Sequence, residues 1–247
     1  MLLPRSPLIE EFEKLMDHTF DNDYWDQIWS GDRATPMSSS APNPHLQAQV
    51  GELAPGSAID AGCGAGAEAI WLAGRGWTVT AADIARAALD FGRERAAAAG
   101  VSDRVEWVQA DLSTWQPVTT YDLVTTHYAH PDIPQLEFYE RIATWVAPGG
   151  TLLIVGHLHP DQHDGDKHGH GHGHGHQQGH GHQQGQGHGD EGHPPAEASA
   201  TAAAITALLD PTSWDVVTAE ESHRAMAVPG GRERTIHDVV VRATRRS

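Results

Sequence analysis

The residues best suited to chemistry lie in and around a glycine-rich segment, AIDAGCGAGAEA. Gly62, Gly64 and Gly66 fall where a short apolar strand gives way to a helix. Glycine at such a junction lets the backbone turn tightly and approach a ligand without a Cβ atom in the way. Asp60 lies two residues before the first glycine, inside the expected strand. A carboxylate at that position suits a ligand that carries a positive charge.

Two more acidic residues follow expected strands. Asp83 ends the strand VTAAD, where a carboxylate can accept hydrogen bonds from both ribose hydroxyls. Asp111 follows VEWVQA, in a position to accept from an adenine amino group. The glycine spacing also fits the dinucleotide pattern G-x-G-x-x-A, which ends at Ala67, so an NAD-dependent enzyme stays an alternative. Three carboxylates at successive strand ends nevertheless favour a cationic adenosine ligand over a pyrophosphate.

Beyond residue 57 the chain alternates strands with helices, which predicts an α/β fold with a parallel sheet covered on both faces. The last two strands are joined by a short Gly-Gly turn, so we expect them to pair antiparallel. We interpret residues 1–56 as an N-terminal helical lid or cap and residues 57–247 as the core. A disordered His- and Gly-rich loop at residues 157–195 interrupts that core, because it has no apolar periodicity.

Five segments in order, AIDAGCGAG, VTAADI, VQADL, YDLVTTHY and APGGTLLIV, resemble the class I S-adenosylmethionine (SAM)-dependent methyltransferases. The resemblance covers roughly residues 57–155. It implies a doubly wound, Rossmann-like sheet of seven strands, mostly parallel with the last strand antiparallel. It also implies SAM as the cofactor.

The resemblance further implies which residues hold that cofactor. Asp60 and the turn at residues 62–66 would hold the methionine moiety, Asp83 the ribose, and Asp111 with the Leu112 amide the adenine. Cys63, inside the turn, is interpreted as a small packing residue and not a nucleophile. The predicted cofactor-binding residues of the core are Asp60, Gly62, Cys63, Gly64, Gly66, Asp83, Ile84, Asp111 and Leu112.

The upstream segment YWDQIWSGDR adds an aromatic pair. Trp25 and Trp29 are four residues apart, on one face of an expected helix. The segment resembles the N-terminal helix of thiopurine and tellurite-resistance type methyltransferases, in which such aromatic residues close over the cofactor. The alternative is a helix packed on the edge of the sheet.

The segment THYAHP follows the fourth strand and supplies the candidate catalytic residues. In this fold that region borders the methyl group that is transferred. His127 and His130 are candidate general bases, because the pKa of imidazole lies near neutral pH, and Tyr128 is a candidate for positioning. Alternatively these side chains only wall the pocket, since an ionised nucleophile such as a thiolate or selenide needs no base.

Twelve of the 18 histidines fall between His157 and His193, many of them alternating with glycine. Neutral imidazoles suit Ni²⁺ or Zn²⁺, but glycine between them removes the fixed geometry that a catalytic metal site requires. We therefore expect either a tolerated low-complexity loop or loose metal binding. The candidate metal ligands are His168, His170, His172, His174, His176, His180 and His182.

Composition limits the choice of partners. The formal charge of −17 repels phosphate backbones and anionic headgroups, so we expect neither nucleic acid nor a membrane as a partner. Without an apolar signal or spanning segment, a cytoplasmic protein is expected. A single cysteine excludes disulfides and thiolate metal sites within one chain. No basic cluster lies near THYAHP, and the candidate cationic residues on the substrate side are His223, Arg224, Arg232 and Arg234.

Two functions follow from the sequence. The first is a SAM-dependent methyltransferase that acts on a small-molecule nucleophile, such as a thiol, selenium or tellurium species. The alternative is a metal-binding protein, for Ni²⁺ or Zn²⁺, that uses its SAM-binding domain for sensing. The predicted partners are thus a small methyl acceptor and a divalent metal ion.

Overall fold

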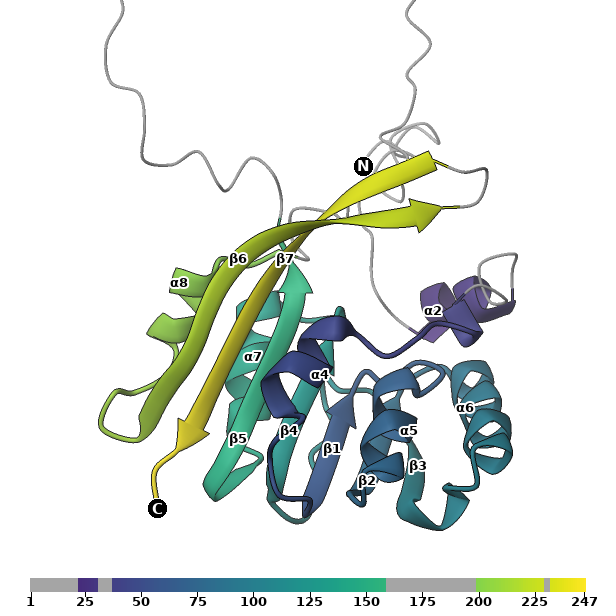
Figure 1. Cartoon of the computed structure of the whole chain (residues 1–247), viewed down its shortest axis with the longest axis horizontal. Helices are drawn as coiled ribbons and strands as arrows, with labels where there is room; N and C mark the ends of the chain where they lie inside the picture. The colour runs from purple at the N-terminus through teal and green to yellow at the C-terminus, as the bar shows by residue number, and fades with distance from the viewer. Residues whose placement is uncertain (1–21, 31–36, 159–198, 229–231) are drawn as a thin grey trace, which may run out of the picture.

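The computed structural model describes residues 22–30, 37–158, 199–228 and 232–247 (Figure 1). These residues form a sheet of seven strands in the order β3-β2-β1-β4-β5-β7-β6. Strands β1 to β5 pair in parallel, and β7 runs antiparallel to both β5 and β6. The expected mostly parallel sheet with an antiparallel last strand is therefore confirmed. The strands are β1 (Ser57–Ala61), β2 (Thr78–Asp83), β3 (Val105–Gln109), β4 (Tyr121–His127), β5 (Val146–His157), β6 (Trp214–Val228) and β7 (Arg232–Arg245).

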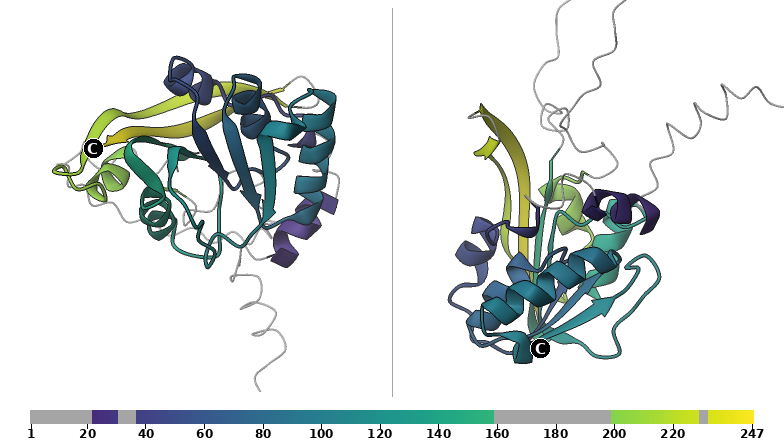
Figure 2. Two further views of the ribbon diagram at one scale, coloured as in Figure 1. Left: turned by 90° about the horizontal axis from the view of Figure 1, so that it is seen from below. Right: turned by 90° about the vertical axis from the view of Figure 1, so that its right-hand side faces the viewer.

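Helices cover both faces of this sheet (Figure 2). One face packs against α4, α5 and α6, which contribute Leu46, Leu72 and Leu89 to one buried cluster. The other face packs against α7 and α8, which contribute Phe138 and Ile205 to a second cluster. The helices are α2 (Asn22–Ser30), α4 (Pro44–Val50), α5 (Ala67–Gly74), α6 (Arg86–Ala98), α7 (Gln135–Ala143) and α8 (Ala202–Ala207), with a 3₁₀ turn η1 (Ser102–Arg104).

The central strands are mostly apolar because they are buried on both sides, and Asp60 of β1 is an exception. In β5, the residues from 150 to 156 are all buried, and β1 is buried from residue 58 to 61. Such strands have no polar face, so their carboxyl ends are the first place where polar side chains can meet solvent or a ligand. The predicted site residues lie at those ends.

The C-terminal hairpin is longer than the sequence pattern predicts. Strands β6 and β7 pair from Trp214 with Arg245 up to Val228 with Arg232. The pairing of β7 with β5 stops at His157 and Asp238, so the outer part of the hairpin extends beyond the carboxyl ends of the parallel strands (Figure 1). This extension adds a wall on one side of the region above β4 and β5.

The segment interpreted as a lid is described in part. Helix α4 packs into the core through Leu46 and Val50, while α2 contacts α6. Residues 1–21 and 31–36 lie outside the described residues, as do residues 159–195 of the predicted loop, whereas His157 ends β5. No helix among the described residues is long and apolar enough to cross a membrane.

Candidate active site

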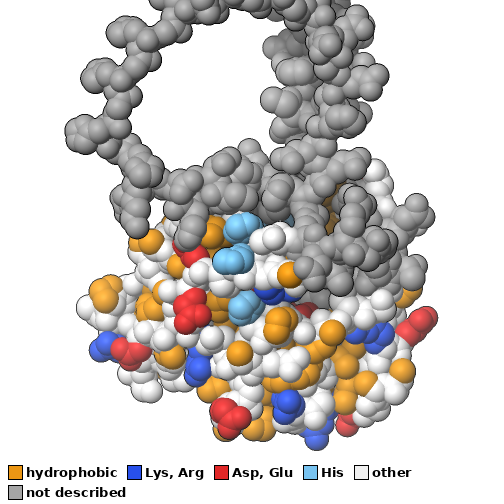
Figure 3. Space-filling model, turned by 45° about the horizontal axis from the view of Figure 1, so that its top comes forward, with side chains coloured by type: hydrophobic (Ala, Val, Ile, Leu, Met, Phe, Trp, Pro, Cys, Tyr) orange, Lys and Arg blue, Asp and Glu red, His pale blue; other side chains and the backbone are white. Residues whose placement is uncertain are grey.

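A cavity of about 530 Å³ opens at the carboxyl ends of the parallel strands. Histidine side chains gather on this face of the molecule (Figure 3). Most of the predicted site residues line the cavity: Trp25, Trp29, Gly62, Cys63, Gly64, Asp83, Ile84, Asp111, Leu112, His127, Tyr128 and His130. Asp60 and Gly66 are not part of its wall.

The glycine turn adopts backbone conformations that other residues rarely take. The φ angle is +80° at Gly62 and +70° at Gly66. A Cβ atom at Gly62 would overlap the side chain of Ala129, which lines the cavity, whereas one at Gly66 would overlap the indole of Trp107. Gly62 thus keeps the floor of the cavity open, while Gly66 allows α5 to begin tightly against β3.

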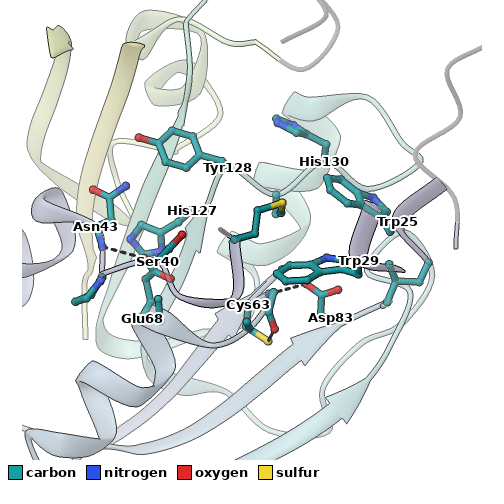
Figure 4. Close-up of a pocket in the computed structure, with 18 of the residues that line it drawn as sticks. Trp25, Trp29, Ser40, Asn43, Cys63, Glu68, Asp83, His127, Tyr128 and His130 are labelled. Carbon is teal, nitrogen blue, oxygen red and sulfur yellow. Dashed lines mark hydrogen bonds between the residues drawn. The ribbon is translucent and has the colours of Figure 1, made fainter. Parts of the chain in front are cut away.

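Asp83 projects from the end of β2 toward this turn. Its carboxylate accepts the N–H of Gly64 at 2.7 Å and the N–H of Ala85 at 2.9 Å. Burial raises the pKa of this carboxyl to about 6. Trp29 lies beside it and packs over Gly64 (Figure 4). The position suits a ribose, because a carboxylate held in this way can accept from two neighbouring hydroxyls.

Asp111, which is predicted to border the adenine, lies in a turn of its own. The Oδ1 of Asp111 accepts the N–H of Ser113 at 2.9 Å and its hydroxyl at 2.6 Å. Trp25 also lines the cavity, and Trp29 is 5% exposed because its ring packs against Phe91 of α6. The helix α2 therefore packs on α6 and not on the edge of the sheet, and it places both tryptophans at the cavity.

A buried polar cluster lies beneath the cavity at the end of β1 and β4. Asp60 is 1% exposed, and its Oδ1 lies 3.9 Å from Nδ1 of His127. Within the described part of the chain, Oδ2 of Asp60 and both ring nitrogens of His127 have no hydrogen-bond partner. Buried polar atoms nearly always have partners, so these atoms fit a polar ligand.

Glu68 completes this cluster, and the sequence analysis missed it. Its Oε1 accepts the N–H of Asn43 at 2.9 Å (Figure 4). Burial raises the pKa of the Glu68 carboxyl, and the nearby His127 opposes that shift. An acidic residue in the first turn of a helix is ordinarily explained by the helix dipole. The sequence therefore offers no separate sign that Glu68 belongs to the buried cluster with Asp60 and His127. Two carboxylates and an imidazole at this place fit an ammonium group.

Tyr128 is held in a strained conformation by the C-terminal hairpin. Its φ of +56° is the sole positive value at a non-glycine residue in the described ranges. The hydroxyl donates to Oδ1 of Asp238 at 2.7 Å and accepts from Nη2 of Arg224 at 3.1 Å. Burial raises the pKa of Tyr128 to about 12, so it keeps its proton at neutral pH. A phenol that keeps its proton does not act as a base, so Tyr128 stays a candidate for positioning.

His130 has a defined tautomer. Nε2 of Gln135 donates to the carbonyl of Ala129 at 3.0 Å, which turns Oε1 of Gln135 toward Nδ1 of His130, 3.1 Å away. Because an amide oxygen only accepts, Nδ1 carries the proton and Nε2 carries the lone pair. Burial lowers the pKa of His130, which keeps the ring neutral at pH 7. The two candidate bases thus occupy different surroundings, with His127 beside Asp60 and His130 beside Gln135.

Comparison with known families agrees with this geometry. Residues 58–150 match the model of a methyltransferase domain. The matched segment is a methyltransferase domain. The match spans β1 to the start of β5 and includes the glycine turn and all three strand-end carboxylates. The class I methyltransferase prediction made from the sequence is confirmed.

Individual relatives of the methyltransferase domain are distant. A probable thiol methyltransferase 2 of Arabidopsis thaliana is 26% identical over 151 residues, which are 58% of this chain and 65% of that protein. The chain spans between 32% and 70% of the lengths of the curated relatives that it matches.

Two solved structures share the fold. The structure of TehB from Haemophilus influenzae has a TM-score of 0.59 at 12% identity, covering 92% of this chain and 67% of that one. Magnesium protoporphyrin IX methyltransferase from Synechocystis PCC 6803, solved with bound SAH, has a TM-score of 0.58 at 16% identity, covering 92% and 97%. At these identities the likeness concerns the fold.

The predicted metal ligands lie outside the described residues. They are His168, His170, His172, His174, His176, His180 and His182. Within the ranges that the structure does describe, no group of three or more His, Cys, Asp or Glu side chains is placed to hold a metal ion. The expectation of Ni²⁺ or Zn²⁺ therefore has no support from the methyltransferase domain.

Proposed function

We propose that the protein transfers the methyl group of SAM to a small-molecule nucleophile. The observation that carries this proposal is the meeting of the glycine turn, Asp83, Asp111 and the buried Asp60–Glu68 pair around one cavity. A cavity of about 530 Å³ falls within the usual range for small-molecule sites. The domain match supports the same activity.

Different residues of the site bind different parts of SAM. SAM supplies an electrophilic methyl group on a sulfonium sulfur. Asp83 accepts from the ribose, and Asp111 with Leu112 borders the adenine. Asp60, Glu68 and His127 receive the ammonium of the methionine moiety, whose N–H groups can donate to the unpartnered Oδ2 of Asp60 and to the lone-pair nitrogen of His127. Trp25 and Trp29 exclude water from the cavity, which strengthens these charge interactions.

His130 is the residue we propose as general base. Its Nε2 lone pair can take the proton of a thiol as the new S–C bond forms and the C–S bond of the sulfonium breaks. The balance leaves a thioether, neutral S-adenosylhomocysteine and an imidazolium. His127 is less suited to this task because it lies 3.9 Å from Asp60, on the side proposed for the ammonium.

A soft nucleophile is the acceptor class that we propose. Support comes from the name of the plant thiol methyltransferase and from the sequence resemblance to the thiopurine and tellurite-resistance group. Methyl transfer to sulfur, selenium or tellurium depends mainly on proximity and orientation, which a cavity of this size can supply.

The test uses metal-stripped protein, methyl-labelled SAM and a panel of thiols, selenite, tellurite and heteroaromatic amines. We expect transfer to at least one thiol without added metal, and loss of transfer in Asp83→Asn. Transfer to the amines but to no thiol would contradict the acceptor class. Intact SAM binding with no transfer to any acceptor would contradict the activity itself, and the assay repeated with Ni²⁺ or Zn²⁺ would show whether metal is required.

A further inference from the structure

The cavity holds two cationic side chains, Arg95 and Arg224, among its described lining residues. The guanidinium of Arg95 donates to the carbonyls of Ala65 at 3.1 Å and Ser40 at 2.8 Å, so it holds backbone segments together. Arg224 comes from β6 and reaches the cavity at the end where Tyr128 lies. Arg224 and Tyr128 are 96 positions apart in the sequence, and the fold brings them together.

The guanidinium of Arg224 is fixed along one edge. Its Nε donates to Oδ2 of Asp238 at 2.7 Å and its Nη2 donates to the hydroxyl of Tyr128 at 3.1 Å. Its Nη1 makes no hydrogen bond to any residue that the structure describes, and it is not buried. The guanidinium is therefore oriented by two contacts and keeps N–H groups available at the cavity. Two parallel N–H groups of a guanidinium match the two oxygens of a carboxylate.

The described acceptors in contact with Arg224 are already occupied by hydrogen bonds. Asp238 is fully buried, and both of its oxygens are already used, because Oδ1 accepts from Tyr128 and Oδ2 accepts from Arg224 and faces Nε2 of His45 at 3.2 Å. The proton of Tyr128 points at Asp238 and its lone pair accepts from Arg224. A carboxylate entering this corner of the cavity would meet the remaining N–H groups of Arg224, while Asp238 lies buried on the guanidinium's other edge.

The strand order separates this corner from the adenosine side. Asp111 follows β3 and Asp83 ends β2, whereas Tyr128 follows β4 and Arg224 lies on β6. A ligand that crosses the cavity from Asp111 and Asp83 through the glycine turn reaches the Arg224 corner last. We therefore place that corner on the side of the methyl acceptor.

We propose that Arg224 forms a carboxylate subsite, so that the methyl acceptor is a small soft nucleophile that also carries a carboxylate. This inference rests on the proposed methyltransferase function. A chain with a formal charge of −17 repels anions at long range, so an anionic acceptor requires a local cation of this kind. The carboxylate on Arg224 orients the acceptor and leaves its thiol for the methyl group.

The experiment compares 3-mercaptopropanoate with 3-mercaptopropan-1-ol, which share the reacting thiol and the chain length. Binding to SAH-loaded protein is measured by calorimetry, and methyl transfer from labelled SAM is measured in parallel. For Arg224→Gln we expect the Kd and KM of the carboxylate to rise about 10- to 100-fold, the range for lost charge-assisted hydrogen bonds, while those of the alcohol stay unchanged. Arg246→Gln is the matched control, because Arg246 pairs with Asp215 on the exposed surface.

A second variant is needed because Arg224→Gln leaves the carboxylate of Asp238 buried without a paired cation, which can disturb folding. The double variant Arg224→Gln/Asp238→Asn removes both charges and should show the same selective loss for the carboxylate, with SAH binding retained. Equal losses for both thiols would overturn the subsite. Weaker SAH binding with unchanged selectivity would also overturn it, because Arg224 would then serve the cofactor. Selective carboxylate binding without methyl transfer to either thiol would support the subsite and contradict the proposed function.

Discussion

Replacing Asp83 by Asn should make cofactor binding insensitive to pH in the range where wild-type binding changes. The pKa of Asp83 is about 6, raised chiefly by burial, and only the ionised form can accept from both ribose hydroxyls. The ionised fraction falls about tenfold between pH 7 and pH 5 for such a pKa, so the affinity of wild type for S-adenosylhomocysteine should fall about tenfold. That factor equals about 1.4 kcal/mol.

The assay is calorimetric titration of S-adenosylhomocysteine at pH 5, 6 and 7. At pH 7 Asp83→Asn should bind about 10- to 100-fold more weakly than wild type, because charge-assisted hydrogen bonds are lost. Comparing the two proteins removes the contribution of other groups that titrate in the same range. Asp90→Asn is the control, since Asp90 is exposed on α6 and pairs with Arg93. An identical pH dependence in wild type and Asp83→Asn would refute the reasoning.

Three further changes test other parts of the structure. Gly66→Ala should lower the free energy of unfolding, measured by thermal denaturation, by about 1–3 kcal/mol more than Gly100→Ala does. Both glycines have a φ of +70°, but only a Cβ atom at Gly66 would meet the indole ring of Trp107. Equal losses in the two variants would contradict this. Gln135→Glu should raise the pKa of His130, because a carboxylate beside the ring favours the imidazolium. The acid limb of the pH profile of kcat/KM should then move upward by about 1 pH unit. An unchanged acid limb would argue against His130 as the general base. Deleting residues 163–193 should leave kcat/KM of metal-free protein unchanged, and a loss of turnover restored by Ni²⁺ or Zn²⁺ would show that the segment takes part.

The local parts of the site could be predicted from the sequence. The glycine turn, Asp83 and Asp111 each follow a strand directly, and the carboxyl ends of parallel strands necessarily share one edge of the sheet. The antiparallel pairing of the last two strands follows in the same way from a short turn between them. These features depend on neighbours in the chain, so the pattern of residue types is sufficient.

The remaining parts depend on contacts between distant segments. Nothing in the local sequence indicates that Asp238 receives hydrogen bonds from Tyr128 and Arg224, which lie 110 and 14 positions away. The different surroundings of His127 and His130 arise from the positive φ of Tyr128 between them, and a tyrosine in an unbroken sequence gives no sign of that conformation. Glu68 was hidden because an acid at a helix start already has an ordinary explanation.

The position of β7 between β5 and β6 has a consequence for how the active site matures. Strand β6 can join the sheet only through β7, so it has no partner until residues 232–245 have been synthesised. Asp238 arrives with that strand, and it fixes both Tyr128 and Arg224. During synthesis, the cofactor side built on β1 to β4 can assemble early, whereas the acceptor side is completed last, by long-range pairing, which is intrinsically slow. On the proposed function, a nascent chain would acquire the residues that bind SAM before those that bind the methyl acceptor.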